Sequence, residues 1–288
     1  MASNVLSLAT RLVQALPDQV SEALAGAVGE AVYLGWRSKR WTARRNYAVV
    51  LEADPQSRVV ARTTRAAFRN HARWVLGNLR LPRSSGSDLK ARLVLQRVDY
   101  LEEAARSDRG MILVSAHFGR PELAMAVLAS RGQQVTTVGE AFAPAPVFKW
   151  ITEAWGYLGV TMLPVEGSAL TLARTLRRSG TVALLVDVGA GAPDAVEVEF
   201  FGRSTLFPSG PAALARLTGA PIVPGYVRRL PGRRFEAVVL PPILPQRTAD
   251  AGRDILVATQ AVAHALESFI GAYPEQWYMF RPMWRPEA

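Results

Sequence analysis

The sequence predicts an α/β fold, with a central, mostly parallel or mixed sheet flanked by helices and a basic helical region at the N-terminus. From about residue 88, strand-like apolar runs alternate with helical stretches, which is typical of a sheet with helices on its faces. Some runs, such as residues 111–114, are continuously apolar, which indicates strands buried on both faces. The 288 residues are 49% apolar and 20% charged, which excludes a disordered chain and supplies one large core.

The first residues predict two helices and a basic segment. Apolar residues recur at helical spacing over 4–36, and Pro17 interrupts the pattern as a helix breaker. Residues 37–45 then carry five cations, edged by two tryptophans: Trp36, Arg37, Lys39, Arg40, Trp41, Arg44 and Arg45. Trp with Lys and Arg is the mixture that settles at a membrane headgroup boundary, so we expect these side chains to bind a membrane.

A third helix is expected over residues 57–80, and its charges are ordered. Six arginines fall within one sector at 100° per residue: Arg58, Arg62, Arg65, Arg69, Arg73 and Arg80. Two interpretations are open, a solvated surface beside a core-facing stripe or a surface that faces lipid. Leu81-Pro82 is expected to end the helix, and residues 83–87 to form a loop.

The remaining elements follow from the switch between strand and helix periodicity. Strands are expected over 111–115, 135–138, 160–165, 182–186, 196–200, 222–227 and 236–240. Helices are expected over 88–107, 121–130, 144–157, 168–179, 211–218 and 252–271. We therefore expect one domain over residues 1–288, with 1–82 as a helical, membrane-facing region and 88–288 as an α/β catalytic core.

The net charge of +10 belongs to the N-terminal third of the chain. Residues 1–100 hold 16 Lys and Arg against 7 Asp and Glu, whereas the rest hold 18 against 17. Such asymmetry indicates a polyanionic partner, which could be nucleic acid, anionic lipid or an acidic carrier protein. No window offers the ~20 uninterrupted apolar residues that a spanning helix needs, so no transmembrane helix is expected.

His117 carries the sharpest chemical signal. It directly follows the buried strand over 111–115, and ligands bind at the carboxyl ends of strands in α/β folds. Pro121 suits the start of the next helix, so Glu122 would lie in its first turn. A carboxylate that orients a histidine makes the ring a general base. The alternative is a buried histidine at a strand end, with Glu122 interacting with the helix dipole.

At this motif the sequence resembles a known family. The pattern His-x4-Glu from His117 to Glu122 is similar to the signature of glycerolipid-type acyltransferases, in the branch of the bacterial lipid A biosynthesis and phosphatidylinositol mannoside acyltransferases. Further segments match that branch in order: residues 185–187, 196–202, 210–215, 218–224 and the closing Pro-Glu-x-Trp at 274–277. The order of these segments over most of the chain is more specific than any one of them.

The resemblance implies roles for two further carboxylates. The mannoside acyltransferases use a glutamate in a Val-Glu-Val segment to orient the histidine, which maps to Glu197. Glu199 shares its strand parity and is the fallback. Without the resemblance, both would be exposed residues of an amphipathic edge strand. Asp187 ends an apolar strand and could line the substrate pocket, or it could initiate a turn.

Two positions depart from the family or need a separate interpretation. Arg120 and Pro121 replace the Asn-Trp usually found between the histidine and the acid, and we expect Arg120 to contact substrate. Ser209 and Gly210 resemble part of a Phe-Pro-Glu-Gly motif, but Ser209 replaces its glutamate. Their backbone N–H groups could hold an oxyanion or phosphate, and simple capping of the next helix is the alternative.

The resemblance implies transfer of a fatty acyl group from acyl-CoA or an acyl carrier protein to a hydroxyl of a glycolipid or related lipid acceptor. The N-terminus lacks the pattern of a secretory signal, so we expect the protein at the cytoplasmic face of the cell membrane, bound peripherally. No metal or cofactor is expected, since the chain has no cysteine and only His71, His117 and His264 as imidazoles. The rivals are a membrane-docking relative without activity and a basic nucleic-acid-binding protein. The chain shows no nucleic-acid-binding module, so no nucleic-acid partner is expected.

Overall fold

The structure is a computed structural model, which describes residues 10, 14–80, 91–106, 108–139, 145–189 and 194–285. Most of the first expected helix, before Pro17, lies outside these residues. The expected helix end at Leu81-Pro82 and the expected loop over 83–87 lie outside them too.

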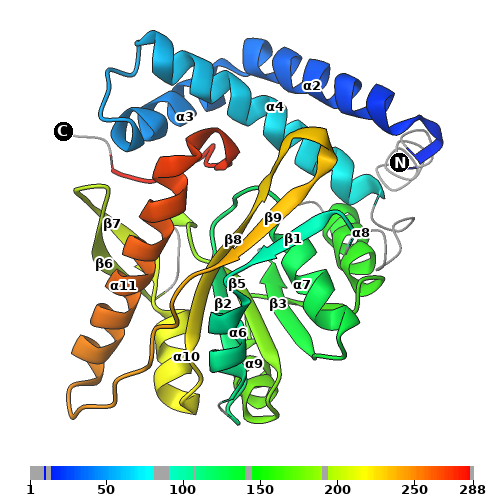
Figure 1. Cartoon of the computed structure of the whole chain (residues 1–288). Helices are drawn as coiled ribbons and strands as arrows, with labels where there is room; N and C mark the ends of the chain where they lie inside the picture. Colours follow the sequence, from blue (N-terminus) through cyan, green and yellow to red (C-terminus); the bar gives the residue numbers. More distant parts are fainter. Residues whose placement is uncertain are drawn as a thin grey trace.

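Seven strands form one mixed sheet in the order β1-β9-β8-β2-β5-β3-β4 (Figure 1). Their bounds are β1 Leu93–Gln96, β2 Met111–Ser115, β3 Val135–Gly139, β4 Val160–Pro164, β5 Thr181–Leu185, β8 Ile222–Arg229 and β9 Phe235–Val239. Every neighbouring pair is parallel except β8 with β9. The prediction of a mostly parallel or mixed sheet flanked by helices is confirmed.

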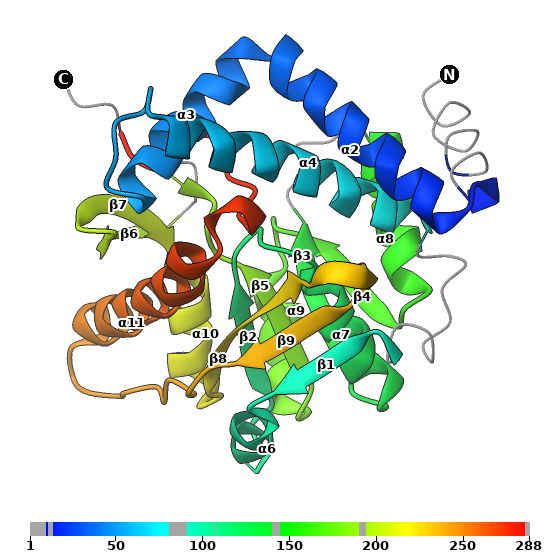
Figure 2. The same ribbon diagram turned by 45° about the horizontal axis from the view of Figure 1, so that its top comes forward.

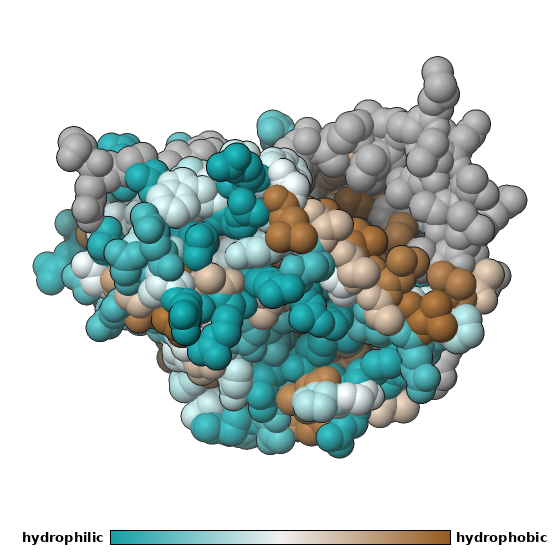
Figure 3. Space-filling view, turned by 90° about the horizontal axis from the view of Figure 1, so that it is seen from above, coloured by the Kyte–Doolittle hydropathy of each residue, from teal (hydrophilic) through white to brown (hydrophobic). Residues whose placement is uncertain are grey.

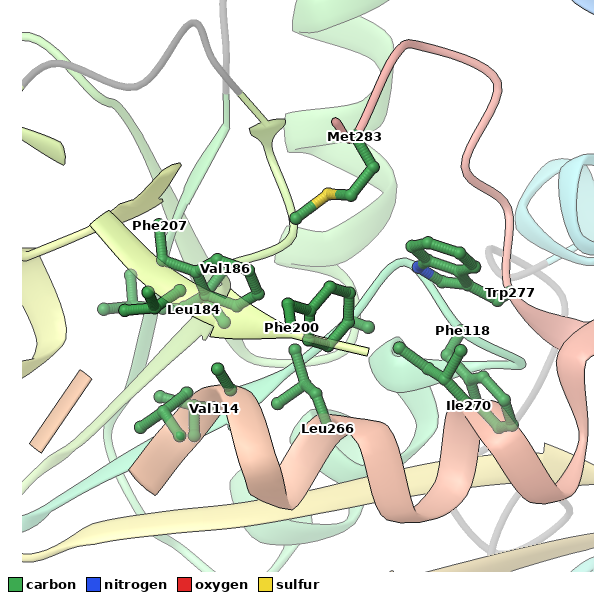
Figure 4. Close-up of a cluster of buried hydrophobic side chains, with 14 of the residues drawn as sticks. Val114, Phe118, Leu184, Val186, Phe200, Phe207, Leu266, Ile270, Trp277 and Met283 are labelled. Atoms are coloured by element: carbon green, nitrogen blue, oxygen red, sulfur yellow. The ribbon is translucent and has the colours of Figure 1, made fainter. Parts of the chain in front are cut away.

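Helices cover both faces of this sheet, as its apolar strands require. They are α6 Val98–Ala105, α7 Pro121–Ser130, α8 Ala145–Gly156, α9 Ala169–Arg177, α10 Gly210–Thr218 and α11 Ala251–Ala272. In the central strand β2, Ile112 and Val114 pack with α9, α10 and α11, whereas Met111 and Leu113 pack toward α6 and α7. Figure 4 shows the first of these cores, in which Ile270 of α11 lies beside Phe118 and Leu266 and Val114 belong to the same cluster.

Two strands differ from the prediction. The expected helix over 88–107 is wrong for β1, because Leu93–Gln96 pairs with β9 as the edge of the sheet. Four residues are too few for periodicity to separate strand from helix, and pairing decides. The second strand, β7 (Arg203–Pro208), was not expected, and it pairs with β6 (Ala195–Phe200) in a separate antiparallel hairpin.

The N-terminal helices lie over one end of the sheet. They are α2 Asp18–Gly35, α3 Arg37–Val50 and α4 Arg58–Arg80. Figures 1 and 2 show α4 running across the ends of the strands, with α2 against its outer side. The two helices pack closely at Gly29, where a Cβ would lie 2.6 Å from the Cα of Arg69. This arrangement makes α4 a cover over the carboxyl ends of the parallel strands.

Three of the six arginines in the α4 stripe form ion pairs with α2. Arg65 pairs with Glu30 at 2.7 Å, and Arg80 pairs with Asp18 at 2.7 Å. Arg73 lies 3.5 Å from Glu22. The interpretation of the stripe as a lipid-facing surface is therefore wrong for Arg73 and Arg80, which lie mostly buried against acidic residues of α2, whereas Arg65 pairs with Glu30 but stays 56% exposed. Arg58 and Arg62, in the first turns of α4, remain exposed.

One described helix, α11, is long and apolar enough to cross a membrane by length and composition alone. The core helix of a soluble protein passes the same test, and a single such helix is weak evidence for a span. In this fold Leu266, Phe269 and Ile270 of α11 are fully buried in the main core. We therefore interpret α11 as a core helix of the sheet.

Candidate active site

His117 lies in the loop between β2 and α7, at the carboxyl end of the central strand. The loop is held from the C-terminal segment, since Tyr278 N donates to His117 O at 2.7 Å and Gly119 N donates to Gln276 O at 2.9 Å. Gly119 has a φ of +57°, and a Cβ there would lie 1.7 Å from the carbonyl oxygen of Val227. Only glycine fits at this position. The His117 side chain keeps 29% exposure, so its ring can meet a substrate.

The carboxylate that binds His117 is Asp187, two residues after β5. Its Oδ1 lies 2.8 Å from His117 Nδ1. The backbone N–H of His117 donates to the same carboxylate, at 2.9 Å from Oδ1 and 3.0 Å from Oδ2. Trp277 Nε1 donates to Oδ2 at 2.8 Å. Strands β2 and β5 are neighbours in parallel register, which brings their following residues together.

Asp187 is fully buried, and the contacts with His117 and Trp277 keep it ionised. Burial alone would raise the pKa of its carboxyl group. The charge of His117 and the hydrogen bonds from His117 and Trp277 outweigh burial and hold this pKa below the usual 3.8. An ionised carboxylate on Nδ1 favours the tautomer with the proton there. In that tautomer the other nitrogen, Nε2, is the one that carries no proton.

Glu122, the acid of the His-x4-Glu motif, does not orient His117. It is buried and forms an ion pair with Arg120, and its Oε2 accepts a hydrogen bond from Trp74 Nε1 at 3.1 Å. Glu122 lies on α7 and Trp74 on α4, so the motif acid ties the covering helix to the site. The expectation that Glu122 holds the ring is wrong, because Asp187 occupies Nδ1.

Arg120 is buried with Glu122 rather than presented to a substrate. Only 7% of the residue is exposed, and its guanidinium lies 5.5 Å from the ring centre of Phe235. A Cβ at Gly77 of α4 would lie 2.0 Å from Arg120 Nη1, so this glycine makes room for the guanidinium. Arg120 therefore belongs to the ion pair beneath α4, and its contact with a substrate stays a prediction.

Glu197 and Glu199 also lie elsewhere. Both are exposed on β6, where Glu197 accepts a hydrogen bond from the Ser204 hydroxyl. The backbone of Glu199 exchanges hydrogen bonds with the side chain of Gln260 on α11, each 2.8 Å long. The expectation that one of them orients His117 is wrong, since their strand lies in the outer hairpin. Their parity was predicted correctly, because Val198 between them is buried.

Ser209 stands at the N-cap position of α10, directly before Gly210. Its side chain makes no capping hydrogen bond with the described residues, so the expectation of a side-chain cap is wrong. Neither residue contacts the His117–Asp187 pair through a hydrogen bond that the described part of the chain contains. A role in binding substrate stays a prediction for both.

Aromatic side chains from α4 and the C-terminal segment cover the site. The ring centre of His71 lies 5.5 Å from Trp74, 5.4 Å from Tyr278 and 5.1 Å from Phe280. Burial, together with the nearby His117, lowers the pKa of His71 from 6.5 to about 4. The sequence suggested packing for His71 but gave Tyr278 and Trp277 no role. The available signal was the closing Pro-Glu-x-Trp segment, which contains Trp277 and directly precedes Tyr278.

A narrow apolar cavity of about 100 Å³ runs between the sheet and helices α6 and α7. Ser115 and Pro121, on either side of the loop that carries His117, line this cavity, as do Leu128 farther along α7 and Leu101 on α6. Well-packed interiors leave few voids. Here the apolar packing on this face divides into three clusters around the cavity. The site therefore adjoins a space suited to a slender apolar group.

The expected membrane-binding residues fall into two groups. Trp36 and Trp41 are 53% and 42% exposed, and Arg37 and Arg45 are exposed as well. Arg40 instead donates to the carbonyl oxygens of Tyr33 and Leu34, at 2.6 and 2.9 Å, and so caps α2. Lys39 lies over the Trp36 ring at 5.9 Å, and Arg44 is half-buried.

Next to Trp36, α2 presents a row of apolar residues whose helical spacing is visible in the sequence and whose side chains are exposed. They are Val20 (49%), Leu24 (47%), Val28 (50%) and Val32 (37%). The spacing of four residues places them on one side of the helix. Figure 3 shows hydrophobic residues gathered on the face seen from above. The small residues Ala25, Gly26 and Gly29 occupy the buried side of α2.

Among the described residues, no group of three or more His, Asp and Glu side chains lies close enough together to hold a metal ion. The described part of the site is thus built from one imidazole and one carboxylate under an aromatic cover.

Comparisons with known proteins agree on one family. The model of the bacterial lipid A biosynthesis acyltransferases matches residues 5–286. A phosphatidylinositol mannoside acyltransferase of Mycolicibacterium smegmatis is 29% identical over 286 residues, covering 95% of this chain and 88% of that protein. A phosphatidylinositol mannoside acyltransferase of Mycobacterium tuberculosis is 30% identical over 247 residues, which cover 84% of this chain and 76% of that protein.

One solved structure is also similar. The 1-acyl-sn-glycerophosphate acyltransferase PlsC from Thermotoga maritima has 12% sequence identity and a TM-score of 0.39, covering 86% of this chain and 97% of that chain. A likeness of that size supports no conclusion by itself. The family model, in contrast, matches nearly the whole length of the chain. The chain therefore belongs to the bacterial lipid A biosynthesis acyltransferase family.

Proposed function

We propose that this acyltransferase moves a fatty acyl group from a thioester, acyl-CoA or acyl carrier protein, to a hydroxyl of a glycolipid or related lipid. The observation that carries the proposal is the buried Asp187 carboxylate on His117 Nδ1, at the carboxyl end of the central strand. A partly exposed imidazole fixed by an ionised carboxylate is suited to general base catalysis at a hydroxyl.

In the proposed reaction, His117 Nε2 takes the proton of the acceptor hydroxyl as its oxygen attacks the thioester carbonyl carbon. The tetrahedral intermediate then expels the thiolate, the carbon–sulfur bond breaks, and Nε2 returns the proton to the sulfur. The products are an ester and a free thiol. Asp187 stabilises the imidazolium that forms between the two proton transfers, and the base contributes about 10²- to 10⁴-fold to the rate.

The cavity beside α7 supports a fatty acyl donor. A chain that entered beside Ser115 and Pro121 would run along α7 toward Leu101 and Leu128. The lining there is apolar, and burial of methylene groups stabilises binding by about 0.8 kcal/mol each. A thioester carbonyl at the mouth of this cavity would lie beside the catalytic loop.

The acceptor is inferred from the relatives, both of which are named phosphatidylinositol mannoside acyltransferases. We therefore propose a lipid that carries sugar hydroxyls, with phosphatidylinositol mannoside as the first candidate. Such an acceptor resides in a membrane, so the enzyme has to work at its surface.

We further propose that the protein binds the cytoplasmic face of the cell membrane peripherally through α2 and the start of α3. The exposed apolar row of α2 and the rings of Trp36 and Trp41 would enter the headgroup region. Arg37 and Arg45 would attract anionic lipid. This surface replaces the arginine stripe of α4, in which Arg65, Arg73 and Arg80 are paired with α2.

The experiment is an acyl transfer assay with the purified protein in detergent. Long-chain acyl-CoA and acyl carrier protein serve as alternative donors, and phosphatidylinositol mannoside and a lysophospholipid as alternative acceptors. Mass spectrometry of the lipid products identifies the new ester, and free thiol release measures the rate. Turnover with one donor and acceptor supports the proposal. Folded protein that binds vesicles but shows no turnover would favour the alternative of a membrane-docking relative without activity. Tight binding of duplex DNA would favour the alternative of a nucleic-acid-binding protein.

A further inference from the structure

The Asp187 carboxylate has two oxygens; the backbone N–H of His117 donates to both, and one side chain binds each. The His117 ring binds Oδ1, and the Trp277 indole N–H donates to Oδ2, both at 2.8 Å. Apart from His117 itself, Trp277 is the one side chain in the described residues that donates to this carboxylate. Trp277 is 0% exposed, so water does not compete for the indole N–H.

We infer that Trp277 is a positioning residue, whose indole N–H fixes the Asp187 carboxylate so that Oδ1 stays on His117 Nδ1; this rests on the proposed function. A carboxylate can rotate about its Cβ–Cγ bond, and rotation would exchange or lose the contact with the ring. A directed donor on Oδ2 opposes that rotation. A hydrogen bond to a charged, buried group is worth more than one between neutral groups.

The indole is itself held firmly from α3. The Tyr47 hydroxyl donates to the carbonyl oxygen of Trp277. Asn46, the preceding residue, donates to the carbonyl oxygens of Met279 at 3.0 Å and Arg281 at 2.8 Å. Tyr47 is fully buried, and this burial raises its pKa well above 10, so the hydroxyl remains a donor. The backbone that carries Trp277 is thus fixed by two neighbouring side chains of one helix.

Aromatic packing fixes the plane of the indole as well. Its ring centre lies 6.0 Å from Tyr47, 6.2 Å from Phe200 and 6.3 Å from Trp284, all in edge-to-face geometry. Figure 4 shows Trp277 beside Phe118, the residue that follows His117, and Phe118 also forms a β-bridge with Trp277. A side chain held from three sides can direct its N–H at one oxygen.

A matched control exists in the same cluster. Trp284 is also buried, and its indole N–H donates to a backbone carbonyl, that of Phe200, at 3.2 Å. Trp277→Phe and Trp284→Phe each remove one buried indole N–H and a similar volume. Only the first removes a donor from Asp187. A third protein, with benzothienylalanine in place of Trp277, replaces the N–H by sulfur at nearly unchanged shape and protects the test against misfolding.

The test combines kinetics with ¹⁵N NMR of the histidine rings, in full-length protein whose melting temperature is recorded. The His117 signals are assigned by their loss in His117→Ala. At a pH high enough to keep the imidazole neutral, wild type and Trp284→Phe should show His117 with its proton on Nδ1. Trp277→Phe and the benzothienylalanine protein should show a mixture with the Nε2–H tautomer, and kcat about tenfold lower at unchanged KM.

Two results would overturn the inference. One is an unchanged tautomer and kcat in both Trp277 proteins. The other is an equal loss of kcat in Trp284→Phe, which would make the cluster merely structural. The NMR measurement needs no turnover, so it remains decisive if the acyl transfer assay fails. A locked Nδ1–H tautomer that Trp277 controls, in a protein without transferase activity, would contradict the proposed function and leave the positioning role standing.

Discussion

At the scale of residues, the site holds two buried carboxylates with different partners. Asp187 binds His117, and Glu122 binds Arg120 and Trp74. We expect Asp187→Asn to lower kcat by about 10²- to 10⁴-fold, because the ring loses the charge that stabilises its imidazolium. Glu122→Gln should instead cost about 3 kcal/mol of stability, because Arg120 is left buried without its charge partner.

Chemical denaturation and kcat measured on both variants separate the two roles. The folded fraction of Glu122→Gln should keep most of the wild-type kcat. A larger loss of kcat in Glu122→Gln than in Asp187→Asn would show that the motif glutamate serves the histidine after all.

His71 makes the stability of the cover over the site depend on pH. Its pKa falls from 6.5 in the unfolded chain to about 4 in the folded protein. The folded state therefore favours neutral His71, and this stabilisation is fully present above pH 6.5. It is lost progressively as the pH falls toward 4, because the unfolded chain takes up the proton first.

We expect the free energy of unfolding to decline between pH 6.5 and 4 in the wild type, and His71→Phe to lack this part of the decline. Urea titrations at pH 7, 5.5 and 4.5 measure it, with His264→Phe as the exposed control on α11. Parallel curves for wild type and His71→Phe would contradict the assignment.

At the scale of elements, the sequence predicted the strands and helices that carry strong periodicity and missed those that depend on pairing. The continuously apolar β2 and the position of His117 after it were predictable, because both are local properties. β1 and β7 were not, since a partner strand decides their conformation. Asp187 lies 70 positions from His117, and only the parallel pairing of β2 with β5 brings them together.

Charge patterns in the sequence likewise did not reveal the partners that are distant along the chain. The arginines of α4 were visible in the sequence, but their acidic partners on α2 lie 35 or more positions away, as Arg65 and Glu30 show. Periodicity finds a face and does not tell what covers it. The apolar row of α2 was likewise visible as helical spacing, and only the structure shows that this row stays exposed.

Helix α7 leads to a prediction about chain length. If the acyl group lies in the cavity along α7, Leu128 limits how far it reaches. Leu128→Ala should therefore shift the products toward acyl chains longer by one or more methylene pairs, since the lost side chain leaves room for them. The product distribution from a mixture of acyl-CoA donors, measured by mass spectrometry, checks this.

Leu217→Ala, at a side chain that is 55% exposed on α10, is the matched control and should leave the distribution unchanged. A distribution that Leu128→Ala also leaves unchanged would mean that the acyl chain lies elsewhere.

At the scale of the whole molecule, the proposed membrane surface and the site lie at the same end of the sheet, where the parallel strands have their carboxyl ends. Figure 1 shows α2 and α4 above the strand ends that His117 follows. We expect Leu24→Glu with Val28→Glu to release the protein from vesicles that contain anionic lipid, because two apolar side chains no longer enter the interface. Sedimentation with vesicles should show at least about tenfold weaker binding.

Leu256→Glu with Val257→Glu, two comparably exposed apolar positions on α11, controls for charge and should bind as the wild type does. Activity of the α2 variant on detergent-dispersed acceptor should survive. Release of the α11 variant instead would place the docking surface on the other side of the molecule.

The most direct test of the central claim, that His117 is the base of an acyl transfer reaction, is kcat for His117→Ala beside His264→Ala. Both variants remove an imidazole, but His264 lies on α11, where its ring forms a hydrogen bond with the Gln260 side chain. In protein shown to be folded, His117→Ala should lower kcat by at least about 10²-fold, and His264→Ala should keep it. Activity of His117→Ala above about a tenth of the wild type would contradict the claim.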